Sequence, residues 1–271
     1  MEPDDKYGYA SINSLSKALF NLSYTKQSNF FDLIQKNIIA ILAYVQKEDL
    51  IKDIINKTNN IPLNFNLYLF ISNNVSLYEI KQYIQMNSKA NKFKVETSFN
   101  YIIDILNKFK YEFKKYKYIC NINYNLYKNI SYFEEWKNYI HNNLLGNSTI
   151  ISEILTDFEN NNNLGLIFPE RYYKSLYKFG DNINDLDLAY LNIILSKINP
   201  KFHILKGIID FPEGNMFWAK SNAIYKIFRL DKHIFNSRKL LLLLENNLDK
   251  IWIYLVGIDG YLYKTIFKSL S

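Results

Sequence analysis

The distribution of apolar residues along the chain predicts strands that alternate with helices. Residues Ile38–Val45 form an unbroken apolar run, which is typical of a strand covered on both faces in a parallel sheet. The next residues, 47–57, carry their apolar side chains at helical spacing. By the same reasoning further strands are predicted at 65–71, 93–97, 118–123 and 164–168, and helices at 75–87, 101–116, 133–160 (interrupted near Gly146) and 183–198. The alternation favours βαβ units. We therefore predict an α/β fold with a mostly parallel, Rossmann-like sheet of at least five strands, residues 38–45 central, and C-terminal helices packed back on it.

The chain length and the polarity of its N-terminus predict how it is organised. Residues 1–35 are polar and weakly patterned, so we expect an N-terminal extension there and a single α/β domain over residues 36–271. A chain of 271 residues can bury a substantial core, and its 48% hydrophobic content is that of a globular protein.

The net charge of +7 is compatible with nucleic acid, an anionic membrane surface or phosphorylated small molecules such as sugar nucleotides. Lysine-rich usage throughout the chain is sufficient to explain most of this charge. The basic and aromatic residues 108–117 could resemble a nucleic-acid patch, but their helical spacing favours an apolar stripe with a basic outer face. We therefore predict no nucleic-acid partner.

Cysteine usage and the apolar runs limit the cellular context. Cys120 is the only cysteine, which excludes an intramolecular disulfide and a cysteine-based zinc site. The longest apolar runs are too short to span a bilayer, and the acidic N-terminus does not have the features of a signal peptide. We predict a cytoplasmic protein and leave peripheral association with the inner face of the membrane open.

The segment Phe211-Pro-Glu-Gly-Asn-Met-Phe-Trp-Ala-Lys220 gathers residues that are rare elsewhere in the chain. Gly214 permits a sharp turn or a close approach of the backbone to a ligand. Trp218 has two interpretations that the sequence leaves open, namely core packing beneath a cleft and contact with a ligand.

Three segments in a fixed order resemble the rhamnan synthesis protein F family, glycosyltransferase-like proteins of bacterial surface-polysaccharide assembly. They are Glu134-Glu-Trp-Lys-Asn-Tyr-Ile-His-Asn-Asn-Leu-Leu-Gly-Asn147, Asn163-Leu-Gly-Leu-Ile-Phe-Pro-Glu170 and the Phe211–Lys220 segment. They are similar to the family patterns W-R-N-Y-L-x-x-N-L-L-G, L-G-x-I-F-P-E and F-P-A-G-x-M-F-W. A closing segment from Asp249 to Lys264 resembles the family's tail. The resemblance covers about residues 38–268 and is most specific in the second half.

The resemblance implies a nucleotide-sugar donor and a lipid-linked or polysaccharide acceptor. In an open parallel sheet, ligands bind outside the carboxyl ends of the strands. The residues predicted there for substrate binding are Asn100, Asn121, Asn123, Gly214, Asn215 and Trp218. The predicted catalytic carboxylates are Asp104 and Glu213, and Glu213 beside the apolar Phe217 and Trp218 is expected to have a raised pKa.

The chain departs from the family pattern at this edge. Where the family has N-R-G-R-D, the sequence Asn100-Tyr-Ile-Ile-Asp104 lacks both arginines, and where it has H-x-H, the sequence is Asn121-Ile-Asn123. Asparagine cannot act as a general base. Two hypotheses therefore stay open: a glycosyltransferase, and a catalytically impaired relative that binds a glycan or a partner protein.

A divalent metal is left open as a cofactor, without an assigned site. Asp185-Leu-Asp187 matches the D-x-D pattern that holds a metal on a donor diphosphate. The motif falls in a predicted helix, so a solvated helical face is the favoured interpretation.

Overall fold

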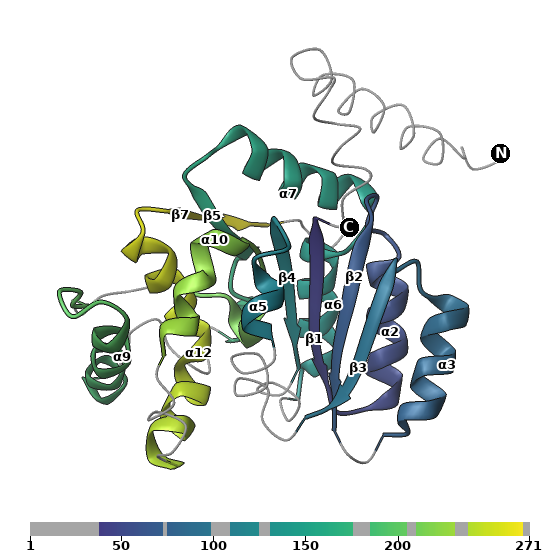
Figure 1. Cartoon of the computed structure of the whole chain (residues 1–271), viewed down its shortest axis with the longest axis horizontal. Coiled ribbons are helices and arrows are strands. Elements are labelled where there is room, and N and C mark those ends of the chain that lie inside the picture. Colours follow the sequence, from purple (N-terminus) through teal and green to yellow (C-terminus); the bar gives the residue numbers. More distant parts are fainter. Residues whose placement is uncertain are drawn as a thin grey trace.

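In the computed structural model, the chain is described over residues 38–72, 75–98, 109–124, 131–175, 185–204, 210–230 and 238–267. Within these ranges one sheet has seven strands in the order β3-β2-β1-β4-β6-β5-β7 (Figure 1). The strands are β1 Ile39–Val45, β2 Phe65–Ile71, β3 Lys92–Thr97, β4 Tyr118–Asn123, β5 Leu164–Pro169, β6 Phe217–Lys220 and β7 Leu262–Ile266. Parallel pairing joins β3, β2, β1 and β4, and also joins β5 to β7. The predicted mostly parallel α/β sheet is confirmed.

Strand β1 lies inside the sheet because it is apolar on both faces. All seven of its residues are buried, and it pairs in parallel with β2 on one side and β4 on the other. Its alternate side chains enter two separate cores, Ile39 and Ile41 on one face and Ala40 and Leu42 on the other. The predicted interior position of this strand is confirmed.

Helices cover both faces of the sheet. The helices are α2 Glu48–Thr58, α3 Leu77–Asn87, α5 Lys110–Phe113, α6 Phe133–Leu144, α7 Ser148–Asn160, α9 Asp185–Ile198, α10 Ser221–Ile224 and α12 Arg238–Ile258, with 3₁₀ turns η2 Glu213–Asn215 and η3 Tyr225–Arg229. One core takes apolar side chains from α2, α3, α6 and α7, and the other takes them from α5, α9, α10 and α12. Asn147 separates α6 from α7 by accepting a hydrogen bond from the Ile150 backbone N–H, 2.9 Å away.

Two features of the sheet differ from the expected pattern. Strand β6 runs antiparallel to both of its neighbours, β4 and β5. The tail, expected to be mostly helical, ends in the edge strand β7, where Leu262 and Tyr263 are largely exposed. An exposed edge strand has no buried face to impose apolar alternation, so its sequence shows no strand pattern.

Other expectations concern the termini and the segment before β4. In the segment before β4, Phe109, Phe113 and Tyr116 are buried while Tyr111 points outward, as the apolar stripe predicted. The predicted helical residues 101–108 and the N-terminal extension lie outside the described residues, and the extension stays a prediction. Within the described ranges, every helix is too short or too polar to cross a bilayer.

Candidate functional site

The turn that precedes β6 lies beside the end of β4, at the carboxyl edge of the parallel strands. Because β6 is antiparallel to β4, Asn121 pairs with Phe217 and the residues before Phe217 continue past the end of β4. The Asn121 side-chain amide donates to the backbone oxygen of Asn215 at 2.6 Å. The structure therefore brings together two of the predicted site segments.

Gly214 is required both by the backbone conformation and by the space around it. Its φ is 65°, in the left-handed region that favours glycine, and Asn215 follows with φ 60°. A Cβ at Gly214 would lie 2.9 Å from two ring atoms of Trp136 and 3.3 Å from the backbone oxygen of Asn123. The close approach that Gly214 permits is thus an approach to α6 and to the end of β4.

Glu213 is buried, with 2% of its surface exposed, and its carboxylate accepts three hydrogen bonds. The donors are Trp136 Nε1 at 3.1 Å, the Tyr172 backbone N–H at 3.2 Å and Arg171 Nε at 3.4 Å. Burial raises the pKa of Glu213, while the three donors and the Arg171 charge oppose that rise. The raised pKa agrees with the sequence-based prediction, but the neighbouring indole is that of Trp136 rather than Trp218. We call Trp136, Arg171, Glu213, Gly214 and Asn215 the turn cluster.

Asn215 connects the turn to α12 on the other side. Its side-chain oxygen accepts a hydrogen bond from Trp252 Nε1 at 2.9 Å. Asn121, Asn123 and Asn215 are each less than 5% exposed. In this structure the Asn121 and Asn215 amides hold the turn against β4 and α12, and none of the three side chains forms an open surface.

Trp218 lies on the opposite face of the sheet from Asn121. Along β4, Cys120 faces the core of α2, α3, α6 and α7, and Cys120 pairs with Trp218, which belongs to the same core. Trp218 is fully buried, and its indole N–H donates to the backbone oxygen of Leu144 at 3.0 Å. Of the two interpretations, core packing describes Trp218, and the expected cleft shared by Trp218 and Asn121 is wrong because neighbouring residues alternate between faces.

The segments that resemble the family patterns contact one another. Trp136 of the first segment donates to Glu213 of the third, and Tyr139 of the first donates through its hydroxyl to the backbone oxygen of Glu170, at 3.0 Å. Ile167 of the second segment pairs with Trp218 of the third. Much of the signature therefore encodes how α6, β5 and β6 fit together.

Two predicted residues, Asn100 and Asp104, lie outside the described residues. Their spatial relation to Asn121 stays a prediction.

Arg171 and Asp249 are charged residues of this region that sequence reasoning missed. The Arg171 guanidinium lies 4.7 Å from the centre of the Phe211 ring, and Lys250 Nζ lies 5.6 Å from it. Asp249 is buried in α12, and burial raises its pKa to about 6 against the charges of Lys250 and Arg171. The sequence contains one feature that could have indicated Asp249. It is an acidic residue on the apolar face of a helix, between Leu248 and Trp252.

The D-x-D motif lies on α9 and does not form a metal site in this structure. Asp185 is exposed, and Asp187 Oδ2 is 3.7 Å from Lys250 Nζ. Across the described part of the chain, no three His, Cys, Asp or Glu side chains are grouped so that they could hold a metal ion.

Comparisons with known proteins identify one family. The family model described as rhamnan synthesis protein F matches residues 9–256. No curated protein sequence matches the chain. A solved structure of glucosyl-3-phosphoglycerate synthase from Mycobacterium tuberculosis, in complex with Mn²⁺, UDP and glucosyl-3-phosphoglycerate, is 11% identical, with a TM-score of 0.35 over 93% of this chain and 77% of that chain. Core-mannan synthase A from Aspergillus fumigatus, in a Mn/GDP form, is 11% identical, with a TM-score of 0.32 over 83% of this chain and 70% of that chain. The family match is therefore the finding that bears on function.

Proposed function

Because the chain belongs to the rhamnan synthesis protein F family, we propose that it is a glycosyltransferase-like protein of bacterial surface-polysaccharide synthesis. The observation that carries the proposal is the family match, which extends over residues 9–256. In its specific form, the protein transfers a sugar from a nucleotide-sugar donor to a lipid-linked glycan acceptor. A cytoplasmic location, with contact at the inner face of the membrane, belongs to the same proposal.

The donor is proposed to bind at the carboxyl edge of β1, β2 and β4, next to the turn cluster. Ligands of open parallel sheets bind at this edge. Asn121 and Asn123 end β4 there, and the turn at Gly214 lies against them. Asn100 and backbone groups at this edge are proposed to contact sugar hydroxyls and phosphate oxygens, while the buried Asn121 and Asn215 amides hold the turn beside them.

The two proposed carboxylates take different roles. All three hydrogen bonds to Glu213 come from protein donors, and the side chain is buried, so Glu213 is proposed to position the turn. Asp104 is then the proposed general base, because it keeps the acid of the family pattern.

Donor binding is tested by thermal shift with a panel of nucleotide sugars, each with and without Mn²⁺ or Mg²⁺. A specific donor should raise the melting temperature of the wild-type protein, since binding to the folded state stabilises it. Asp104→Asn should keep this shift and lose transfer to a glycan acceptor by at least 10²-fold, which is the usual scale of general-base catalysis. The matched control Asp49→Asn, on the exposed start of α2, should keep both.

The second hypothesis is a non-catalytic relative that binds a glycan or a partner protein. It is favoured by asparagine at both positions of the family's H-x-H pattern, Asn121 and Asn123. Transfer that is absent with every donor, or unchanged in Asp104→Asn, contradicts the catalytic assignment. Donor shifts without transfer support the non-catalytic hypothesis.

A further inference from the structure

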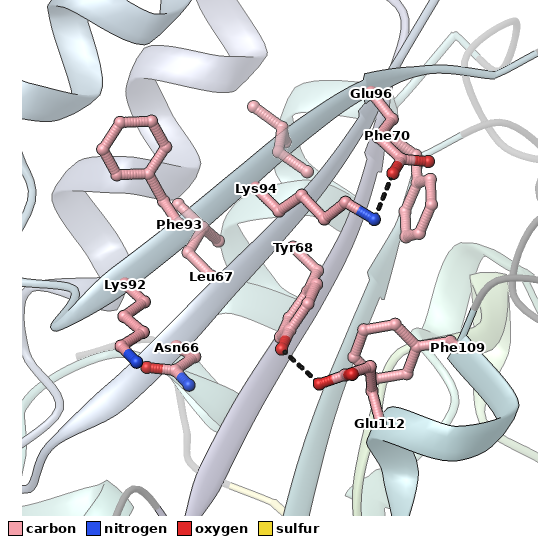
Figure 2. Close-up of a pocket in the computed structure, with 11 residues that line it drawn as sticks. Asn66, Leu67, Tyr68, Phe70, Lys92, Phe93, Lys94, Glu96, Phe109 and Glu112 are labelled. Atoms are coloured by element: carbon pink, nitrogen blue, oxygen red, sulfur yellow. Dashed lines mark hydrogen bonds and ion pairs between the residues drawn. The ribbon is translucent and has the colours of Figure 1, made fainter.

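A cavity of about 420 Å³ lies on the face of the sheet formed by β2 and β3, apart from the turn cluster. Its floor is made by paired residues of the two strands, Asn66 with Lys92, Tyr68 with Lys94, and Phe70 with Glu96. Phe109 and Glu112, at α5, close one side (Figure 2). The volume falls within the range of about 300–1,000 Å³ typical of small-molecule sites.

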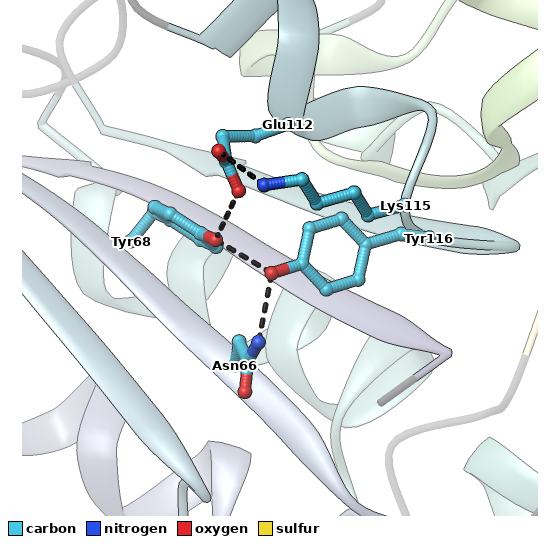
Figure 3. A network of polar contacts seen from close by, with 5 residues as sticks. All are labelled: Asn66, Tyr68, Glu112, Lys115 and Tyr116. Atoms are coloured by element: carbon cyan, nitrogen blue, oxygen red, sulfur yellow. Dashed lines mark hydrogen bonds and ion pairs between the residues drawn. The ribbon is translucent and has the colours of Figure 1, made fainter. Parts of the chain in front are cut away.

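A chain of hydrogen bonds fixes the polar wall of this cavity. The Tyr116 hydroxyl accepts from Asn66 Nδ2 at 2.7 Å and lies 2.5 Å from the Tyr68 hydroxyl. Tyr68 in turn donates to Glu112, which is held by Lys115 at 2.7 Å (Figure 3). The network links β2 to the segment around α5, so the wall is formed before any ligand binds.

Asn66 brings an unused hydrogen-bonding atom to this wall. The residue is only 7% exposed, and its Oδ1 has no hydrogen-bond donor among the residues that the structure describes. Buried side-chain amides normally find partners for both of their polar atoms. In Figure 2, Asn66 ends next to Lys92 at one end of the cavity. The oxygen is almost fully enclosed, so a ligand donor group would satisfy Asn66 after a local side-chain movement opens the way to it.

The rings and hydrogen-bonding groups of the cavity suit a hydroxyl-rich ligand. Lys92 and Lys94 are balanced by Glu96 and Glu112, and Lys94 is ion-paired with Glu96. Glu112 is also paired with Lys115, so Lys92 is the lining charge that remains, and the lysines disfavour a metal ion. Tyr68 and Phe109, in edge-to-face contact with ring centres 4.2 Å apart, add apolar surface beside the hydroxyl, amide and carboxylate groups. Sugar rings combine C–H faces with hydroxyls that both donate and accept.

We propose that the β2–β3 cavity binds a sugar unit of the glycan, with Asn66 and Tyr68 as its hydrogen-bonding residues. The inference deepens the proposed function, on which the identity of the glycan rests. It places the glycan chain along the sheet face, away from the turn cluster where the donor is proposed to bind.

The test measures binding of a rhamnose trisaccharide to the whole chain by isothermal titration calorimetry and saturation-transfer NMR. The variants are Asn66→Ala and Tyr68→Phe, and the matched controls are Asn87→Ala and the exposed Tyr78→Phe, both on α3. Loss of one hydrogen bond is expected to raise Kd roughly five- to tenfold in the cavity variants. Both controls should bind like the wild-type protein. Should Asn66→Ala fail to fold, Tyr68→Phe alone tests the proposal, because it removes only the hydroxyl of a partly exposed side chain.

The outcomes separate this inference from the donor proposal. Weaker trisaccharide binding in the cavity variants, with unchanged donor thermal shifts, supports a distinct glycan site. No trisaccharide binding, or equal affinity in cavity and control variants, overturns the inference. UDP or inorganic phosphate that binds at the cavity in preference to the neutral sugar also overturns it. Trisaccharide binding without any donor shift keeps the cavity assignment and removes the donor proposal.

Discussion

The turn cluster and the β2–β3 cavity both place aromatic, asparagine and glutamate side chains against the sheet, but these side chains have different roles in the two regions. In the turn cluster, Glu213 is 2% exposed and its carboxylate is taken by three protein donors. In the cavity, Tyr68 is partly exposed, and an oxygen of Asn66 has no donor among the described residues.

The comparison teaches that proximity to the family signature does not by itself identify a ligand-binding surface. The signature residues Trp136, Glu213 and Trp218 form hydrogen bonds to other parts of the fold. The cavity residues belong to the first half of the chain, where the resemblance is less specific. We therefore expect mutations in the turn cluster to affect stability and mutations in the cavity to affect binding.

The largest effect is expected for Glu213→Ala. Removing the carboxylate leaves Arg171 and the Trp136 indole N–H buried without their acceptor, which should lower the free energy of unfolding by about 3–5 kcal/mol. Glu213→Gln keeps one acceptor oxygen and the volume, so its loss should be smaller. Urea denaturation measures both. A loss below about 1 kcal/mol in Glu213→Ala would show that the carboxylate does not hold the turn.

Gly214→Ala tests the fit of the turn against α6. Left-handed strain of about 1–2 kcal/mol and the clash with Trp136 should together cost about 2–4 kcal/mol in the free energy of unfolding. Two other glycines separate these causes. Gly260→Ala, with φ 74° and open space, should cost only the strain, and Gly257→Ala, in α12 with open space, should be neutral or stabilising. Equal losses in Gly214→Ala and Gly260→Ala would contradict the close packing.

Asp249→Asn tests the buried acid behind the turn as a function of pH. With a pKa of about 6 in the folded protein against an ordinary value of 3.8, the folded state binds the proton more tightly than the unfolded state. The stability of the wild-type protein should therefore fall as pH rises from about 4 to about 6. The difference between these two values corresponds to about 3 kcal/mol at pH 7, where Asp249→Asn should be the more stable protein.

The check is a series of denaturation curves for both proteins between pH 3.5 and pH 7. Burial also raises the pKa of Glu213. Because Glu213 is present in both proteins, its contribution to the pH dependence largely cancels when the two stabilities are subtracted. A difference that does not change with pH would show that Asp249 titrates as it does in the unfolded chain.

The smallest effect on stability is expected for Tyr68→Phe. The hydroxyl is part of a network that Tyr116 and Asn66 maintain without it, so the free energy of unfolding should fall by about 1 kcal/mol or less. Urea denaturation beside the Tyr78→Phe control measures it. A loss as large as that of Gly214→Ala would break the comparison between a structural cluster and a binding cavity.

The strongly patterned elements could be predicted from the sequence because burial imposes the pattern. Strands β2 and β4 have the predicted bounds, and the break between α6 and α7 falls near Gly146, as predicted. Strand β7 could not be predicted because it is an exposed edge. The direction of β6 could not be predicted either, since local sequence does not record which neighbours a strand will have.

The sequence predicted which segments of the chain form the candidate site. It did not predict the directions in which their side chains point. The sequence indicated that the segment before Trp218 and the end of the strand at Asn121 belong to one edge. It did not indicate that Trp218 and Asn121 face opposite sides, because that depends on the register between β6 and β4. Arg171 and Asp249 are distant in sequence from Glu213 and Phe211, so only the folded chain brings their charges together.

The antiparallel direction of β6 has a consequence for how this fold can vary. Strands β5 and β6 are paired in opposite directions, so the chain leaves β5 and enters β6 at the same edge of the sheet. Residues 170–216 are thus one long connection between two neighbouring strands, which we call the arm. The entropy of closing such an arm grows only slowly with its length. Within the arm, α9 buries Leu191, Ile194 and Leu195 in the core that it shares with α12, so changes in length are expected outside α9. At the two ends of the arm, the contacts of Arg171 and Tyr172 with Glu213 hold the chain together whatever the length of the connection between them.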